Sequence, residues 1–334
     1  MEFKDFTAGK DDSDRRLDKI TRILLADKSL TEIYKLIRKG LVKLNHKKAK
    51  AESHVSEGDC ISIAAFLFND KPQSQAADKK LSPADFQSNP ALEIVFENED
   101  LLIIDKPYDR SVHGKEDGIY KDVLNYLNDK NDSTQSLAFT PGPLHRLDRK
   151  TTGLLVFSKS LKGARWFTEG IKNHTIQKKY YGLAEGKLVQ EEVWTDFINE
   201  KQEKNHGFYT LKAEKKSENK ASDKGPSLEC ITIAKPLAYG KSNGKDFSLI
   251  EYTIKTGRKH QIRSQSALHG HPLAGDVAYG AIKLKKPSSR DFYLQAYSLT
   301  FPENELELPH QIKIELSADF IEQLQCCGIK KSGL

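Results

Sequence analysis

Cysteines are few in this chain, and their positions exclude two kinds of site. There are four of them, at Cys60, Cys230, Cys326 and Cys327. Structural zinc sites place their ligands at short, repeated spacings, and disulfide-rich domains need a framework of paired cysteines. Neither pattern is present, so we expect reduced thiols and no metal site.

Long apolar segments are missing as well. Residues 1–16 are charged and lack the apolar stretch of a signal peptide. The longest apolar run, residues 61–68, is far shorter than the roughly 20 residues that a membrane-spanning helix needs. We therefore expect a cytoplasmic protein that does not bind a membrane.

Acidic residues are absent from residues 33–51, which hold seven lysines and arginines. A capping box formed by Ser29 and Glu32 precedes this stretch and predicts a helix that ends at Gly40. The helix and the hairpin expected after it carry Lys35, Arg38, Lys39, Lys43, Lys47 and Lys48. A solvated helix face normally mixes charges of both signs, so a surface of one sign predicts contact with nucleic-acid phosphates.

The length of 334 residues allows two domains, each with its own core. Residues 1–68 form one compact unit of helix and strand patterns. Residues 69–90 are polar and lack apolar periodicity, which is typical of a linker. A second domain is expected at residues 91–326.

Predicted strands outnumber predicted helices in this second domain, and the two types do not alternate. Strands are expected at residues 92–96, 101–104, 154–157, 180–184, 228–233 and 249–254, and helices at residues 121–128 and 161–172. This order favours an α+β fold over a doubly wound sheet. The strongly polar segment 199–227 is expected to be a surface excursion.

Residues 145–153 are the most informative stretch, because they place one carboxylate, Asp148, among basic residues. Leu144 and Leu147 interrupt the charges, and an apolar run follows at once. We therefore expect a loop that enters a buried strand. A single acid presented among cations suits acid or nucleophilic chemistry on a nucleic acid.

Two further segments stand out. Lys178-Lys179-Tyr180-Tyr181 opens a predicted strand, and residues 256–263 form a dense run of basic and amide side chains that we expect to be a loop. Taken alone, the tyrosines would be ordinary strand core and Arg263 a surface charge.

Together the three segments resemble the RluA family of pseudouridine synthases. His-Arg-Leu-Asp followed by hydroxyl residues and Gly153, Lys-x-Tyr at residues 178–180, and Thr-Gly-Arg-x-His-Gln-Ile-Arg at residues 256–263 are similar to the three motifs of that family, in the same order. The resemblance covers about residues 92–302. Upstream, Arg16-Leu17-Asp18 and residues 37–45 and 55–59 resemble the alpha-L RNA-binding motif.

The resemblance implies a fold and an activity. The fold would be a mixed, mostly antiparallel central sheet flanked by helices and loops, preceded by a small α/β RNA-binding domain. The activity would be the isomerisation of specific uridines in RNA to pseudouridine, after the base has left the stack. This reaction needs neither a cofactor nor a metal.

The resemblance also implies roles for individual residues. Asp148 would be the essential group, as nucleophile or as base, and Arg263 would form an ion pair that keeps it ionised. Tyr180 would stack on the uracil, and a part for its phenol in proton transfer is a further hypothesis. The substrate-binding residues would be Arg146, which fills the space of the flipped base, together with His145, Ile262, His260 and Gln261.

Large-subunit ribosomal RNA, or a ribosome precursor, is the expected partner, because family members with the appended RNA-binding unit mostly act there. We expect the protein to be a monomer. Transfer RNA is the alternative substrate. A non-catalytic ribosome-assembly factor is an alternative of another class, but such a factor would not need Asp148, Tyr180 and Arg263 together. A glycosidase would be expected to use two carboxylates and is disfavoured.

Overall fold

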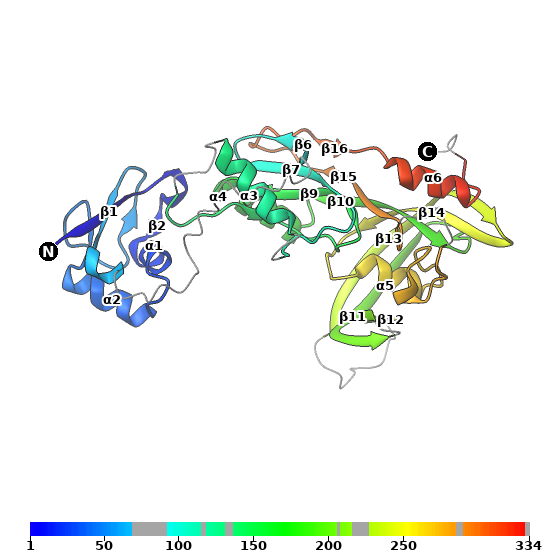
Figure 1. Cartoon of the computed structure of the whole chain (residues 1–334), viewed down its shortest axis with the longest axis horizontal. Coiled ribbons are helices and arrows are strands. Elements are labelled where there is room, and N and C mark those ends of the chain that lie inside the picture. Colours follow the sequence, from blue (N-terminus) through cyan, green and yellow to red (C-terminus); the bar gives the residue numbers. More distant parts are fainter. Residues whose placement is uncertain are drawn as a thin grey trace, which may run out of the picture.

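The structure is a computed structural model that describes residues 1–68, 92–114, 118–130, 136–205, 208–215, 227–284 and 290–330, with the backbone alone at 199–205 and 208–215. The linker expected at residues 69–90 lies outside the described residues. Figure 1 shows an elongated molecule with a small N-terminal unit at one end and a long twisted sheet in the remainder.

The small unit combines two short sheets with two helices. Its elements are β1 (Phe3–Thr7), a 3₁₀ turn (Lys10–Asp12), β2 (Arg15–Arg16), α1 (Leu17–Leu24), α2 (Leu30–Lys39), β3 (Val42–Leu44), β4 (His54–Val55), β5 (Cys60–Ala64) and a second 3₁₀ turn (Ala65–Phe68). One sheet has the order β1-β5-β3, and β2 pairs with β4. The helices and the larger sheet share a buried apolar cluster that includes Ile20, Ile33 and Ile63.

The capping pattern predicted α2 correctly. Ser29 lies before the first helical residue, where its backbone N–H donates to the Glu32 carboxylate at 2.8 Å and its hydroxyl accepts the Glu32 N–H at 3.4 Å. Gly40 ends the helix in the left-handed conformation, with φ of 74°. Ile33 and Ile37 are buried against the core, whereas Lys35, Arg38 and Lys39 are exposed.

The rest of the chain is built on an 11-stranded sheet. Its strands are β6 (Glu93–Glu97), β7 (Leu101–Lys106), β8 (Gly142–Pro143), β9 (Thr152–Ser158), β10 (Gln177–Glu185), β11 (Glu192–Asn205), β12 (Phe208–Lys215), β13 (Ser227–Ser242), β14 (Lys245–Ile254), β15 (Leu294–Thr300) and β16 (Gln311–Lys313). The order is β12-β11-β13-β14-β10-β15-β9-β7-β6, with β16 added to β15 and β8 to β9. The pair β9–β15 is parallel and the others are antiparallel. The predicted α+β class with a mixed, mostly antiparallel sheet is confirmed.

Helices cover parts of this sheet. They are α3 (Ile119–Asp129), α4 (Leu161–Lys172), α5 (Gln261–Leu268) and α6 (Ala318–Cys326). Figure 1 shows α3 and α4 near the small unit, and α5 and α6 toward the other end. Within the described part of the chain, no helix is long and apolar enough to cross a bilayer.

One expectation from the sequence was wrong. Residues 261–263, expected in a loop, open α5, whose amphipathic pattern is weak because its inward side carries buried Ser264, Gln265 and Ser266. The segment 199–227, predicted to be a surface excursion, includes the end of β11 and β12, which is the edge strand of the sheet. Backbone hydrogen bonds pair these two strands, and their sequence lacks the alternation of apolar and polar residues from which a strand can be predicted.

Candidate active site

The backbone of the Asp148 loop is shaped by close packing between strands. The loop leads from β8 into β9, and the Thr151 N–H donates to the Asp148 carbonyl at 3.0 Å. Gly153 follows with φ of 107°, and a Cβ there would lie 2.2 Å from the Ala296 carbonyl oxygen on β15. Only glycine fits this approach of β9 to β15, so the glycine of the motif allows the pairing that holds the loop.

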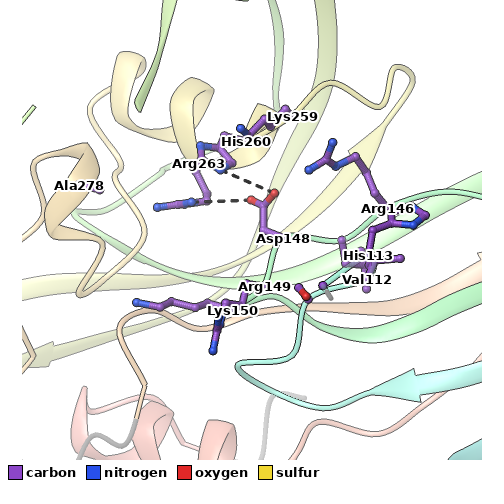
Figure 2. Close-up of a pocket in the computed structure, with 13 residues that line it drawn as sticks. Val112, His113, Arg146, Asp148, Arg149, Lys150, Lys259, His260, Arg263 and Ala278 are labelled. Carbon is purple, nitrogen blue, oxygen red and sulfur yellow. Dashed lines mark ion pairs between the residues drawn. The ribbon is translucent and has the colours of Figure 1, made fainter. Parts of the chain in front are cut away.

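Two basic side chains converge on the carboxylate of Asp148. Arg263 Nη1 lies 3.8 Å from one oxygen, and His260 Nε2 lies 3.8 Å from the other. Figure 2 shows the carboxylate pointing at both side chains, while Arg146 approaches from the other side. The three side chains are largely buried, with 17% of Asp148, 11% of Arg263 and 14% of His260 exposed. Charges interact strongly in such surroundings, because little water screens them.

Arg263 is held by a second carboxylate, Asp276, which sequence reasoning did not assign. Its Nε and Nη2 donate to the two Asp276 oxygens at 2.7 and 2.8 Å, and its guanidinium lies 4.8 Å from the Tyr279 ring and 4.6 Å from the Phe292 ring. Burial alone would lower the pKa of Arg263, but the hydrogen bonds and charge of Asp276 raise it. The bidentate pair thus keeps Arg263 charged and directs Nη1 toward Asp148.

His260 contributes as a neutral ring. Burial lowers its pKa to about 4, although the charge of Asp148 opposes this shift. The Nδ1 atom lies 2.8 Å from the Tyr279 hydroxyl. With its proton on Nε2, the ring can accept from Tyr279 and direct an N–H at Asp148. Its φ of 53° places it in the left-handed region, where the chain turns from the loop into α5.

Two hollows meet at Asp148. The larger, of about 460 Å³, extends past Lys150 and His113, and the smaller, of about 320 Å³, extends to Tyr180 and Ile262. Six residues line both hollows: Arg146, Leu147, Asp148, Lys259, His260 and Arg263. The structure therefore brings Arg146, Tyr180, His260, Ile262 and Arg263 together around the predicted carboxylate.

Tyr180 and Lys178 occupy one face of β10, two residues apart, and both line the smaller hollow. Burial raises the pKa of the Tyr180 phenol well above its usual range, and the negative charge of Asp148 raises it further. Burial lowers the pKa of Lys178 to about 8. The phenol is thus a neutral hydrogen-bond donor at physiological pH.

Lys106 connects the Asp148 loop to the chain after β7, a role that the sequence did not reveal. It is fully buried, and its ammonium donates to the carbonyls of Pro107, Arg110 and Arg149 at 2.9, 2.8 and 2.9 Å. Burial lowers its pKa to about 7, opposed by the charge of Asp148. Its Lys-Pro sequence after a buried strand was the available signal.

His145 and Gln261 support the walls of the site. His145 Nε2 accepts the N–H of Val156 at 3.2 Å, and burial lowers the pKa of the ring to about 3. Gln261 bonds through both ends of its amide to Thr256, Arg258, Ile231 and Thr232. Because these bonds use the whole amide, Gln261 holds the preceding loop in place. Substrate contact by either residue stays a prediction.

The basic residues predicted to bind RNA lie on the small unit. Lys35, Arg38, Lys39, Lys47 and Lys48 are exposed, and Lys43 is half-buried with its ammonium 4.2 Å from the Phe3 ring centroid. None of the six forms an ion pair with a residue in the described ranges. Their charges are therefore available to phosphate groups.

Comparison with protein families identifies the chain. Residues 100–268, about half of its length, match the family model described as RNA pseudouridylate synthase. The chain belongs to this family. It is an RNA pseudouridine synthase, an isomerase, and the match of residues 15–61 to the S4 domain identifies an RNA-binding domain.

Relatives of this pseudouridine synthase align over most of its length. The chain is 27% identical to the ribosomal large subunit pseudouridine synthase C of Vibrio vulnificus, over 95% of this chain and 92% of that one. It is 29% identical to the protein of that name from Haemophilus influenzae, over 93% of each chain. An RNA pseudouridine synthase of Bacillus subtilis is 26% identical over 84% of each.

A solved structure shares the fold. Human RNA Pseudouridylate Synthase Domain Containing 1 superposes with a TM-score of 0.55 over 72% of this chain and 89% of that chain, at 21% sequence identity. At this identity the likeness supports the fold of the pseudouridine synthase and nothing finer.

Proposed function

We propose that this protein isomerises specific uridines of large-subunit ribosomal RNA, with Asp148 as the essential group. The carboxylate of Asp148, placed where two hollows meet and within 3.8 Å of Arg263, carries the proposal for the site. The names of the relatives from Vibrio vulnificus and Haemophilus influenzae support the choice of RNA. Separate apolar clusters support the proposed division into residues 1–68, a linker at 69–90 and a catalytic domain at 91–326.

The reaction rearranges one nucleotide without gain or loss of atoms. The bond between N1 of uracil and C1′ of ribose breaks, and its electron pair stays on the base. The base turns, C5 bonds to C1′, and C5 then loses its proton while N1 gains one. Asp148 acts as nucleophile at C1′ or as base toward a sugar proton, and both roles need the ionised form that Arg263 stabilises.

The other residues hold the flipped nucleotide. Arg146, exposed at the junction of the hollows, takes the place of the base in the RNA and contacts phosphate. Tyr180 stacks on the uracil, and Ile262 packs on its other side. Because burial disfavours the phenolate, Tyr180 acts through its O–H and is a poor base by itself. His260 steadies Asp148 as a neutral donor.

The test maps pseudouridines in total RNA from cells with and without the gene, by chemical labelling and reverse-transcription stops. A site in large-subunit ribosomal RNA should vanish on deletion and return with the wild-type protein. The Asp148→Asn variant should not restore it, whereas Asp129→Asn, an exposed carboxylate at the end of α3, should. A lost site in transfer RNA would overturn the choice of RNA, and restoration by Asp148→Asn would overturn the role of Asp148.

A further inference from the structure

A second concave surface lies away from the active site, where the small unit meets the catalytic part. This groove has a volume of about 840 Å³ and is lined mainly by α1 and the strand before it, with Arg165 of α4 on its other side. Its basic residues are Arg15, Arg16, Lys19, Arg22 and Arg165. Figure 1 shows the small unit carrying α1 beside the end of the molecule that holds α4.

Specific hydrogen bonds join the two sides of the groove. The buried Asp12 carboxylate accepts from the Leu137 and Ala138 N–H groups at 2.7 and 3.0 Å. Asp11 accepts the N–H of Leu161, at the start of α4, at 3.0 Å. Arg15 Nη1 donates to the Ala138 carbonyl at 3.1 Å. The bonds to the Leu137 and Ala138 N–H groups engage both oxygens of the buried Asp12 carboxylate, so they favour one docked arrangement of the two units.

The free charge in the groove is positive. Lys19, Arg22 and Arg165 are exposed and form no ion pair with any described residue. Of the nearby acids, the buried Asp18 pairs with Arg16 at 2.7 Å, and the exposed Asp14 is hydrogen-bonded to His54 at 2.7 Å, so cations outnumber acids in the lining. A concave surface that carries unpaired positive charges attracts a polyanion. A guanidinium group can donate two hydrogen bonds to the oxygens of one phosphate.

Helix α4 links this groove to the active site. Arg165, in the middle of the helix, lines the groove, and Ile171, near its end, lines the smaller hollow beside Tyr180. Six residues of α-helix span about 9 Å. The groove and the smaller hollow therefore reach the same helix at points about 9 Å apart along its axis.

We propose that this groove binds the sugar-phosphate backbone of the RNA that presents the uridine, so that both units grip one RNA at a set distance from Asp148. The proposal rests on the action of the enzyme on a structured RNA and adds a binding surface that crosses from the S4 domain to α4. RNA is favoured over an acidic protein because α4 leads from the groove to the site where RNA must enter.

The first test reverses single charges. Arg165→Glu and Lys19→Glu are compared with Lys313→Glu, an exposed lysine on β16 outside the groove. Binding to transcripts of large-subunit ribosomal RNA and of a transfer RNA is measured across a salt series, and the single-turnover rate is measured at saturating RNA. For the RNA that is modified, each groove variant should weaken binding on the order of tenfold and lower the salt slope by about 1. The rate at saturation should stay within about twofold, because no catalytic side chain has changed.

Groove variants that bind both RNAs like Lys313→Glu would overturn the proposal, and acidic ribosomal proteins would then be the partner to test. If the wild-type enzyme leaves the ribosomal transcript unmodified, the choice of RNA fails, but the binding comparison still reports on the groove.

The second test disturbs the docking without touching a cation. Asp12→Ala removes the acceptor that holds Leu137 and Ala138. RNA affinity should fall by about as much as in Arg165→Glu. The double variant should bind RNA only slightly more weakly than either single variant, because each change disrupts the same surface. Full additivity of the two changes would show that the groove does not act as one surface.

Discussion

The proposed active site and the proposed RNA-binding surfaces both contain arginine and lysine but place them in opposite ways. In the active site, Arg263 is 11% exposed and is held by two hydrogen bonds to Asp276, and buried Lys106 donates to three carbonyls. On the small unit, Lys35 and Arg38 are exposed and form no ion pair with the described residues. Buried charges position one another, whereas exposed charges attract an RNA.

The difference has an energetic consequence. Removing one partner of a buried pair leaves the other charge unsatisfied and costs about 3–5 kcal/mol. An exposed cation contributes far less, and salt screens its contribution. Substitutions in the active site should therefore have large effects that are not additive, and those on the basic surfaces should have small, additive and salt-dependent effects.

The strongest test of this contrast is Asp148→Asn, which keeps the shape of the side chain and removes its charge. Isomerisation should fall by about 10⁴-fold or more, because the carboxylate proposed as the essential group is lost. RNA affinity should stay within about tenfold of the wild type, since phosphate contacts dominate binding. Single-turnover assays and binding titrations measure the two effects. Substantial activity in the variant would contradict the proposed role of Asp148.

Asp276→Asn tests whether Asp276 acts only by orienting Arg263. Without the bidentate carboxylate, Arg263 loses its fixed orientation toward Asp148, and the single-turnover rate should fall by about 100-fold, as for a misplacement of about 1 Å. The KM should change little, because Asp276 lines neither hollow. A control at Asp129 should behave as the wild type. A change in KM alone would instead assign Asp276 to RNA binding.

Lys106→Met should act mainly on stability. The loss of three hydrogen bonds from a charged group should reduce the free energy of unfolding by about 2–4 kcal/mol at pH 7, measured by urea titration.

The Lys106 contribution should also depend on pH in a set direction. Burial lowers the folded-state pKa to about 7, so between pH 7 and the unfolded pKa near 10.4 the unfolded state binds more protons. The contribution of Lys106 thus rises with pH across that window, and below pH 7 it levels off at its lowest value because both states are then protonated. The difference between wild type and Lys106→Met should grow from pH 7 to 9, and a constant difference would contradict the buried, low-pKa lysine.

The smallest effects are expected on α2. Lys35→Gln, Arg38→Gln and Lys39→Gln should each weaken RNA binding a few-fold and lower the salt slope by about 1, with free energies that add. The rate at saturating RNA should not change. Lys313→Gln, at an exposed position on β16, is the matched control. Complete loss of RNA binding after one of these changes would contradict the expected difference between the basic surface and the active site.

Local patterns allowed much of the fold and part of the site to be predicted. The capping box at Ser29 and the stop at Gly40 defined α2, and short apolar runs located β7, β9 and β14. Helix α5 was not predicted, because the residues that it buries include the polar Ser264 and Gln265 and so give no apolar periodicity. Gln265 bonds to Trp194 and Asp196 across the sheet, partners that no local pattern can show.

Within the site, motifs singled out Asp148, Tyr180 and Arg263 but missed the residues that hold them. Asp276 follows a glycine in the segment after α5, and as a lone acid near several histidines it was a detectable signal. Lys106 had only its Lys-Pro context. Supporting residues are difficult to predict because their role depends on which distant groups they reach.

By itself, the sequence determined most of the elements, the acid presented among cations and the basic stretch without acids, because periodicity, capping and charge spacing are local properties. The tertiary structure alone decided that Asp148 and Arg263, 115 positions apart in the chain, face each other. It also decided that Asp12 docks the small unit beside α4. The physical reason is that sheet order and the satisfaction of buried charges bring together groups whose distance along the chain carries no information about their distance in space.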